Sequence, residues 1–190
     1  MSIIALQLQE PAAGVVRGWW ELLAQEAGIT GVKKVPFPHI TLAGCHGVEA
    51  PAIQEVMEEL SRRVPPLRLN AVGLGLFLEP EPVIYVPVVR GRLLEELHHQ
   101  LWEALSHLRG EMYPFHAPER WLPHITLAQF DLRRERMAQV LATMTKLDVN
   151  LEFEVRNLTL FDWIGPRYEP QERYALYTKP FMGGWTSPEA

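Results

Sequence analysis

Two histidines of this 190-residue chain stand in identical surroundings. Residues 38–43 read PHITLA, and residues 123–128 repeat the same six letters. A repeat of this length, 85 residues further along the chain, indicates an internal duplication. Each copy places a histidine two residues before a threonine. The repeat therefore combines an imidazole, which can transfer protons, with a hydroxyl, which can donate a hydrogen bond.

The composition of the repeated segment favours a β-strand. The segment is short, carries β-branched residues and begins with a proline. Side chains alternate between the two faces of a strand, so we expect His39 and Thr41 to point one way and Ile40 and Leu42 the other. The second copy follows the same alternation. If the two halves pack as related lobes, four polar side chains meet in one cleft.

Two imidazoles and two hydroxyls suit phosphoryl chemistry on a ribose or a similar diester. A neutral imidazole can accept a proton while an imidazolium protonates the leaving oxygen, because the unperturbed pKa of histidine is about 6.5. The threonine hydroxyls can donate to non-bridging phosphoryl oxygens, and no metal is required. A single such histidine would more often be a core residue. Two copies at the same offset from a hydroxyl favour a functional site.

The paired His-x-Thr strands, each written Pro-His-Ile-Thr-Leu-Ala, resemble the two-histidine phosphoesterase superfamily. This superfamily includes 2′-5′ RNA ligase-like proteins and cyclic nucleotide phosphodiesterases. The resemblance covers most of the chain, because the elements around each motif also recur. It implies an α+β, two-lobed, pseudo-symmetric duplicated fold in which antiparallel sheets line a central cleft and helices lie outside. It further implies that His39 and His124 are catalytic and that Thr41 and Thr126 bind the substrate phosphate.

The sequence departs from the family pattern at one position. In the RNA ligase-like branch an arginine often stands five residues after the second motif histidine, whereas this chain has Gln129. Glutamine can donate a hydrogen bond but carries no charge to offset a phosphate. Three other residues are candidate substrate contacts. These are His116 and Arg120, in the loop before the second motif, and Lys34, before the first. A solvated loop position is the alternative for each.

Composition and charge limit the class of partner. A net charge of −5 and a pI near 5.8 do not suit a broad basic face for long nucleic acids, so a nucleotide or a short RNA end is the expected substrate. The single cysteine, Cys45, excludes an internal disulfide and fits a reducing compartment. Neither a signal peptide nor an apolar run of about 18 residues is evident. We therefore expect a cytoplasmic monomer that does not contact membranes.

The remaining pattern predicts a βαββ-like unit in each half. Helices are expected at 11–28, 51–64, 91–108 and 131–147, with Asp131 as the N-cap of the last. Strands are expected at 3–8, 67–78, 83–89, 151–163 and 173–179. In 67–78 and in 151–163 the apolar alternation changes phase, which predicts a bulge in each strand. One domain is expected over 1–190, with motif halves at about 29–90 and 110–181.

Together with the residues of the two motifs, the resemblance implies a metal-independent phosphodiesterase of the 2′-5′ RNA ligase-like type that uses no cofactor. It would act on a 2′,3′-cyclic phosphate or a 2′-5′ phosphodiester by paired-histidine acid-base catalysis. The alternative is a noncatalytic module that binds a nucleotide phosphate in the same cleft, which Gln129 mildly favours.

Glutamate and histidine alternate every four residues from Glu95 to His107. An exposed ladder of weak helix pairs is favoured there over a metal site.

Overall fold

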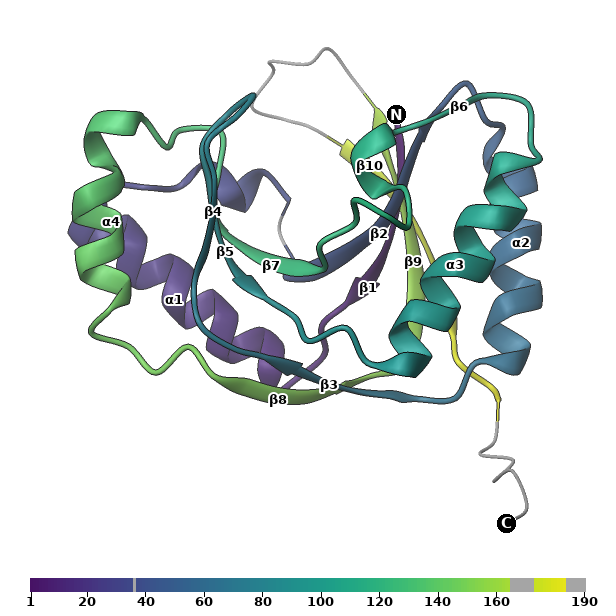
Figure 1. Cartoon of the computed structure of the whole chain (residues 1–190), viewed down its shortest axis with the longest axis horizontal. Coiled ribbons are helices and arrows are strands. Elements are labelled where there is room, and N and C mark those ends of the chain that lie inside the picture. Colours follow the sequence, from purple (N-terminus) through teal and green to yellow (C-terminus); the bar gives the residue numbers. More distant parts are fainter. Residues whose placement is uncertain (36, 165–172, 184–190) are drawn as a thin grey trace.

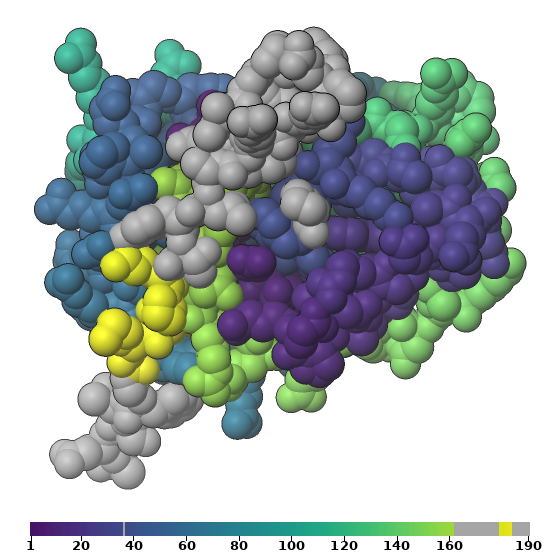
Figure 2. All heavy atoms as spheres, turned by 180° about the vertical axis from the view of Figure 1, so that it is seen from behind, coloured from purple at the N-terminus to yellow at the C-terminus, as the bar shows by residue number. Residues whose placement is uncertain are grey.

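The computed structural model describes residues 1–35, 37–164 and 173–183, and its centre is an antiparallel sheet shared by both halves of the chain (Figure 1). The short strand β6 (Glu111–Met112) pairs with the C-terminal end of β2. Seen from behind, the N-terminal residues and β9 lie side by side, as the pairing of β1 with β9 requires (Figure 2). The main sheet has the order β10 (Arg173–Pro180), β9 (Asn157–Ile164), β1 (Ser2–Gln7), β2 (His39–His46), β7 (His124–Ala128), β5 (Val83–Pro87) and β4 (Gly75–Phe77).

The helices pack on the main sheet in two pairs, one for each lobe (Figure 1). In one lobe α1 (Ala12–Ala27) contacts α4 (Met137–Met144) and β7. In the other, α2 (Ala50–Arg63) contacts α3 (Arg92–Ser106) and β9, and α3 contacts β2. The main hydrophobic core contains buried residues from all four helices and both motif strands. Among the described residues, no helix combines the length and the apolar character needed to cross a membrane.

Three helices form where the apolar periodicity predicts them, but the last begins later than expected. It starts at Met137, after the 3-10 turn η3 (Arg134–Arg136), and Asp131 does not cap it. The Oδ2 atom of Asp131 instead accepts hydrogen bonds from the backbone N–H groups of Thr30 and Gly31, both at 2.8 Å. Asp131 therefore fixes the start of η1 (Gly31–Lys34), the turn that precedes the first motif strand.

The predicted bulges in 67–78 and 151–163 are wrong, because each of these segments changes sheets. Strands β3 (Leu67–Ala71) and β8 (Leu151–Val155) form a separate two-stranded antiparallel sheet. The chain then leaves this sheet and enters the main sheet as β4 or β9. In the second segment the apolar phase changes because β9 buries Leu158 and Leu160 in the main core, a different layer from the one that β8 packs on. In the first segment the new phase is not a buried one, since Val72 and Leu76 are exposed.

Two tryptophans bind the backbone of the motif strands. Trp20 of α1 donates from Nε1 to the carbonyl oxygen of Thr126, and Trp121, in the loop before β7, donates to the carbonyl oxygen of Thr41. Both donor–acceptor distances are 2.9 Å. The tryptophans are 4% and 1% exposed, so these bonds form away from water. Each motif threonine thus has its carbonyl group held by an indole from a different part of the chain.

Trp20→Phe should lower the free energy of unfolding by about 1–3 kcal/mol more than Trp19→Phe, since it leaves a buried carbonyl without its donor. Both tryptophans are buried on α1, but Trp19 makes no hydrogen bond within the described residues. Trp19→Phe therefore controls for the loss of ring volume. Urea unfolding followed by circular dichroism measures the difference. Equal losses in the two variants would contradict the stated role of the indole bond.

Candidate active site

The two motif strands meet at one residue pair. Strands β2 and β7 are antiparallel neighbours, and Ile40 pairs with Ile125. One step from this pair places each motif histidine opposite the threonine of the other strand. Directly opposed residues point to the same face of a sheet, so all four polar side chains share one face. We call it the motif face, and it is defined by His39, Thr41, His124 and Thr126.

Both histidines are held in the same way. His39 Nδ1 lies 3.1 Å from the carbonyl oxygen of Phe37, and His124 Nδ1 lies 2.6 Å from the carbonyl oxygen of Leu122. A carbonyl oxygen only accepts, so Nδ1 carries the hydrogen in each ring. The Nε2 atom of each neutral imidazole therefore has a free lone pair. Both side chains remain partly exposed, which leaves this nitrogen available for proton transfer.

Phenylalanine rings enclose His39. Its ring centroid lies 5.6 Å from that of Phe37 and 5.3 Å from that of Phe161. These two phenylalanines form a small apolar cluster with Ala5, apart from the main core. The pKa of His39 is lowered to about 4, mainly by burial and to a smaller extent by charge repulsion from the nearby His124, against the opposing effect of the hydrogen bond to Phe37. His39 is therefore neutral near pH 7, the state that a general base requires.

Aromatic rings also enclose His124, but one of them is a phenol. The His124 ring centroid lies 5.4 Å from that of Phe77 and 4.8 Å from that of Tyr85. Burial lowers the pKa of His124, and the hydrogen bond to the Leu122 carbonyl opposes this shift. The two lobes therefore enclose their histidines differently, although the motifs are identical.

An extra residue follows each motif threonine. The pairing of β2 with β1 skips Leu42, and the pairing of β7 with β5 skips Leu127. Each skipped leucine and the alanine after it are buried, so two successive side chains face the core. These β-bulges reverse the alternation and turn the following residues, Gly44 and Gln129, toward the motif face. Gln129 thus lies where its side chain can reach a ligand, although it carries no charge.

His116 lies beside the motif face. Its ring packs over Gly44, where a Cβ atom would come within 3.3 Å of His116 Nδ1. This nitrogen is buried and has no hydrogen-bond partner among the described residues. Burial lowers the pKa of His116 to about 4, with smaller contributions from His124 and His98. A neutral third imidazole therefore borders the quartet, at the position that Gly44 leaves free.

The two cationic candidates lie further out. Arg120 is exposed, and its guanidinium makes no hydrogen bond or ion pair within the described part of the chain. Lys34 is also exposed, and its Nζ lies 5.3 Å from the centroid of the Phe130 ring. Phe130 lies two residues beyond the end of β7, so Lys34 lies near the end of the second motif strand. Of the candidate contacts, His116 lies beside the motif face, Gln129 directly follows β7, Lys34 lies over the Phe130 ring and Arg120 is exposed.

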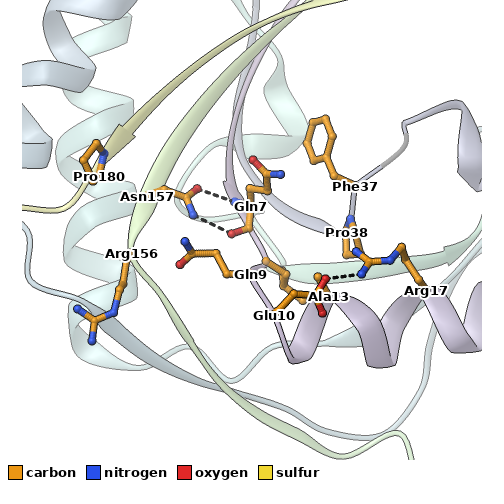
Figure 3. Close-up of a pocket in the computed structure, with 11 residues that line it drawn as sticks. Gln7, Gln9, Glu10, Ala13, Arg17, Phe37, Pro38, Arg156, Asn157 and Pro180 are labelled. Atoms are coloured by element: carbon orange, nitrogen blue, oxygen red, sulfur yellow. Dashed lines mark hydrogen bonds and ion pairs between the residues drawn. The ribbon is translucent and has the colours of Figure 1, made fainter.

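A pocket of about 490 Å³ lies beside the His39 end of the motif face (Figure 3). Gln7 lines it and pairs with His39 across β1 and β2, so its side chain shares the motif face. Asn157 fixes the backbone of Gln7 by accepting from its N–H at 3.0 Å and donating to its carbonyl at 2.9 Å. Arg17 turns toward Glu10 and forms an ion pair with it in the same view.

Metal-binding groups do not cluster in the described residues. No set of three or more histidine, cysteine, aspartate or glutamate side chains is arranged there to hold a metal ion. The alternating glutamates and histidines from Glu95 to His107 are exposed on α3 and its C-terminal end, and Glu95 forms an ion pair with Arg90 at 3.0 Å. Cys45 is buried in the main core. The glutamates and histidines of this series are therefore surface residues, and Cys45 is a core residue.

The residues around the quartet could not be found from the motif. Phe77 and Tyr85 come from two strands between the motifs, and Phe161 comes from a strand after both. No spacing in the sequence relates them to the histidines. Phe37, two residues before His39, was the one available signal, because alternation along an extended chain places it on the same side.

The fold and the motif face define a duplicated α+β protein with two paired His-x-Thr strands. Solved structures share this fold. The protein TT0787 of Thermus thermophilus has a TM-score of 0.67 and 20% sequence identity, over 96% of this chain and 98% of that one. Escherichia coli LigT complexed with 3′-AMP has a TM-score of 0.56 and 17% identity, over 95% and 96% of the two chains. A comparison with curated proteins gave no match.

The family model of the 2′-5′ RNA ligase superfamily matches residues 8–167. The chain belongs to this superfamily, since the match covers most of its length. The resemblance and the fold class predicted from the repeated motif are both confirmed. Membership makes the chain a phosphoesterase-type protein, in which the repeated strands provide the candidate catalytic groups.

His39 should titrate with a midpoint near pH 4 in NMR spectra of the ring resonances. The cause is burial between phenylalanine rings, so Phe161→Ala should move the midpoint upward toward about 6.5 by admitting water. A midpoint of 6 or more in the unaltered protein would show that the rings do not exclude water from this imidazole.

Proposed function

We propose that this protein is a metal-independent phosphodiesterase that acts on a 2′,3′-cyclic phosphate or a 2′-5′ phosphodiester of nucleotides or short RNA ends. The observation that carries the proposal is the matched state of the two histidines. Each donates from Nδ1 to a backbone carbonyl, each keeps Nε2 free, and each stands opposite a threonine of the other motif. Two such imidazoles on one face are suited to paired proton transfer.

In the proposed hydrolysis, one histidine accepts a proton from water through Nε2 as the water oxygen attacks phosphorus. The bond between phosphorus and one ribose oxygen breaks, and the other histidine protonates that oxygen from its own Nε2. The product is a phosphomonoester with a free ribose hydroxyl. Each well-placed proton transfer contributes about 10²- to 10⁴-fold to the rate. His39 is the better candidate for the base, because burial between phenylalanines keeps it neutral.

Thr41 and Thr126 would bind the phosphate. They lie on opposite strands of the same face, each across from a histidine, so their hydroxyls flank the centre of the quartet. A hydroxyl can donate a hydrogen bond to a non-bridging phosphoryl oxygen. Negative charge accumulates on that oxygen in the transition state, when the attacking oxygen bonds to phosphorus and the leaving oxygen departs. The indole bonds from Trp20 and Trp121 hold the threonine backbones and thereby orient these donors.

Small nucleotides are the substrate class that we propose. Structures of Escherichia coli LigT, which shares the fold, are complexed with 3′-AMP, ATP and NADP+. The net charge of −5 likewise disfavours a long nucleic acid track. His116 and Gln129 are the proposed neutral contacts to such a ligand, and Lys34, which lies over the Phe130 ring, is the proposed cationic one.

The same reasoning extends to the organisation of the chain. We infer one domain over 1–190, with motif halves at about 29–90 and 110–181, because both halves contribute strands to the main sheet and residues to the main core. We also propose that the protein is cytoplasmic and monomeric. Measuring its molecular mass in solution tests the monomeric state.

His39→Ala and His124→Ala should each lower turnover at least about 10²-fold while leaving the fold intact, since each removes one proton transfer. His107→Ala, at an exposed position after α3, is the matched control and should retain activity. The assay offers 2′,3′-cyclic nucleotides, RNA ending in a cyclic phosphate and 2′-5′ dinucleotides, with chelator present. Product from either motif variant at the unaltered rate would refute the mechanism.

A noncatalytic module would give a different result in the same assay. It would show no product, yet its melting temperature would rise with nucleotide concentration, because a ligand that binds only the folded state stabilises it. Chelator-resistant product that disappears in both motif variants separates the enzyme from this module.

The pH profile of kcat/KM should be bell-shaped with its optimum below about pH 6.5. Burial lowers the pKa of both histidines in the free protein, so the base becomes active at acidic pH. The acid must be protonated, and a lowered pKa means that it loses its proton as the pH rises toward neutrality. Initial rates at low substrate concentration between pH 4 and pH 8 measure the profile. An optimum above about pH 7 would contradict this assignment.

A further inference from the structure

An aromatic cluster borders the motif face at the end where β2 leaves the first motif. Its members are Tyr113, Phe115 and His116, which lie in or directly before the 3-10 turn η2 (Pro114–His116). The Tyr113 ring centroid lies 5.5 Å from that of Phe115 and 5.2 Å from that of His116. We call these three residues the η2 cluster.

Strand pairing places Tyr113 on the motif face. Strands β6 and β7 pair with the same edge of β2, because β1 occupies its other edge. The pairing of Cys45 with Met112 continues to Gly44 and Tyr113, where the Tyr113 N–H donates to the Gly44 carbonyl at 2.8 Å. Directly opposed residues share a face. Since Gly44 is turned toward the motif face, the Tyr113 side chain lies on that face as well.

The position of His116 agrees with this register. Its ring lies over Gly44, where a Cβ atom would meet His116 Nδ1 at 3.3 Å and Ile3 Cδ1 at 3.0 Å. Ile3 packs against the small apolar cluster that encloses the first motif histidine, so this space is on the motif face. The charge of His124 contributes to the lowered pKa of His116, which shows that the two imidazoles are near each other. The η2 cluster therefore lies next to the second motif histidine.

The η2 cluster presents aromatic surface to solvent. Phe115 is 52% exposed and Tyr113 is half-buried, and within the described part of the chain their rings contact only each other and His116. Trp121, the largest ring of the same loop, is 1% exposed and stacks on His98, with centroids 3.7 Å apart and an interplanar angle of 4°. The tryptophan is therefore a core contact, and Tyr113 and Phe115 are the rings that a ligand can reach.

The spacing between the η2 cluster and the quartet suits a nucleotide. Gly44 is the next residue of β2 on the motif face after Thr41, and successive residues on one face of a strand lie about 7 Å apart. A ribose separates its 3′-phosphate from its base by a similar distance. A phosphate held among the motif residues can therefore place its base over Tyr113, which lies opposite Gly44.

We propose that the nucleobase of the ligand stacks on the η2 cluster, against the Tyr113 ring and beside Phe115. Every base has a π-face, so such a contact tolerates any base, and a purine offers more surface than a pyrimidine. The inference rests on the proposed nucleotide substrate, but it concerns binding and requires no turnover. It predicts a preference for purine nucleotides without strict selection of one base.

Calorimetric titration with 3′-AMP, 3′-CMP and inorganic phosphate tests the contact, because only the nucleotides carry a base. The unaltered protein should bind 3′-AMP at least about fivefold more tightly than phosphate, with 3′-CMP between them. Tyr113→Leu should weaken 3′-AMP binding roughly 5- to 100-fold and leave phosphate binding unchanged. Tyr113→Phe is the matched control, since it keeps the ring and should retain the affinity for 3′-AMP.

Two outcomes of the titration would overturn the inference. One is an unaltered protein that binds 3′-AMP no better than phosphate, including the case in which it binds neither. The other is a loss in Tyr113→Leu that is equal for nucleotide and phosphate, which would show a disturbed motif face rather than a lost stack. The turnover assay is separate: a protein that prefers nucleotides as expected but forms no product refutes the phosphodiesterase proposal and keeps the stacking contact.

A measurement on the unaltered protein does not depend on how a variant folds. In NMR spectra of the complex with 3′-AMP, nuclear Overhauser effects should connect the base protons with the ring protons of Tyr113 or Phe115. Base contacts with Phe37 would instead place the base in the pocket beside His39, at the other end of the motif face. Either that result or the absence of contacts with both η2 rings would overturn the inference.

Discussion

The pairing of Ile40 with Ile125 is the contact on which the candidate site depends. It is the one register point at which the two motif strands join, and it sits between histidine and threonine in both. Moving the register by a single residue would turn the polar side chains of one motif to the opposite face. Both isoleucines are fully buried, so the hydrophobic core fixes the register that brings the two histidines together.

The rest of the site maintains what this pairing creates. Indole groups bind the threonine carbonyls, backbone carbonyls fix the tautomer of each imidazole, and aromatic rings pack against both histidines. These interactions act on different atoms of the same short strands. A face whose threonine backbones and histidine rings are already held needs little reorganisation when a ligand binds.

The sequence was informative where one local pattern determined the structure. The repeated hexapeptide was enough to predict the quartet and the duplicated fold, and apolar periodicity was enough to place α1, α2 and α3. It was misleading where two local explanations compete. A change of apolar phase fits a bulge as well as a change of sheet, so the segments that contain β3 and β8 were misread.

In the motif strands the structure has two β-bulges that the sequence did not predict. Leu42 and Leu127 continue an apolar run, and nothing in their neighbours reveals that each is skipped by the adjacent strand. Tyr85 and Phe161 could not be linked to the histidines either, because only the order of strands in the sheet brings them near. Asp131 was assigned to the wrong turn because it precedes a helix in sequence but contacts an earlier segment in space.

The position of the two bulges has a consequence for how such a chain could arise. Each follows its motif threonine, so the irregularity belongs to the repeated unit and not to one lobe. Two identical strands that pair antiparallel about one isoleucine make the contact that two copies of a single half would form across a two-fold axis. The candidate site thus has the geometry of a symmetric dimer interface contained in one polypeptide. Neither half alone contains both motif histidines. Once the halves were joined, each could change separately, which is how a tyrosine can face one threonine while an alanine faces the other.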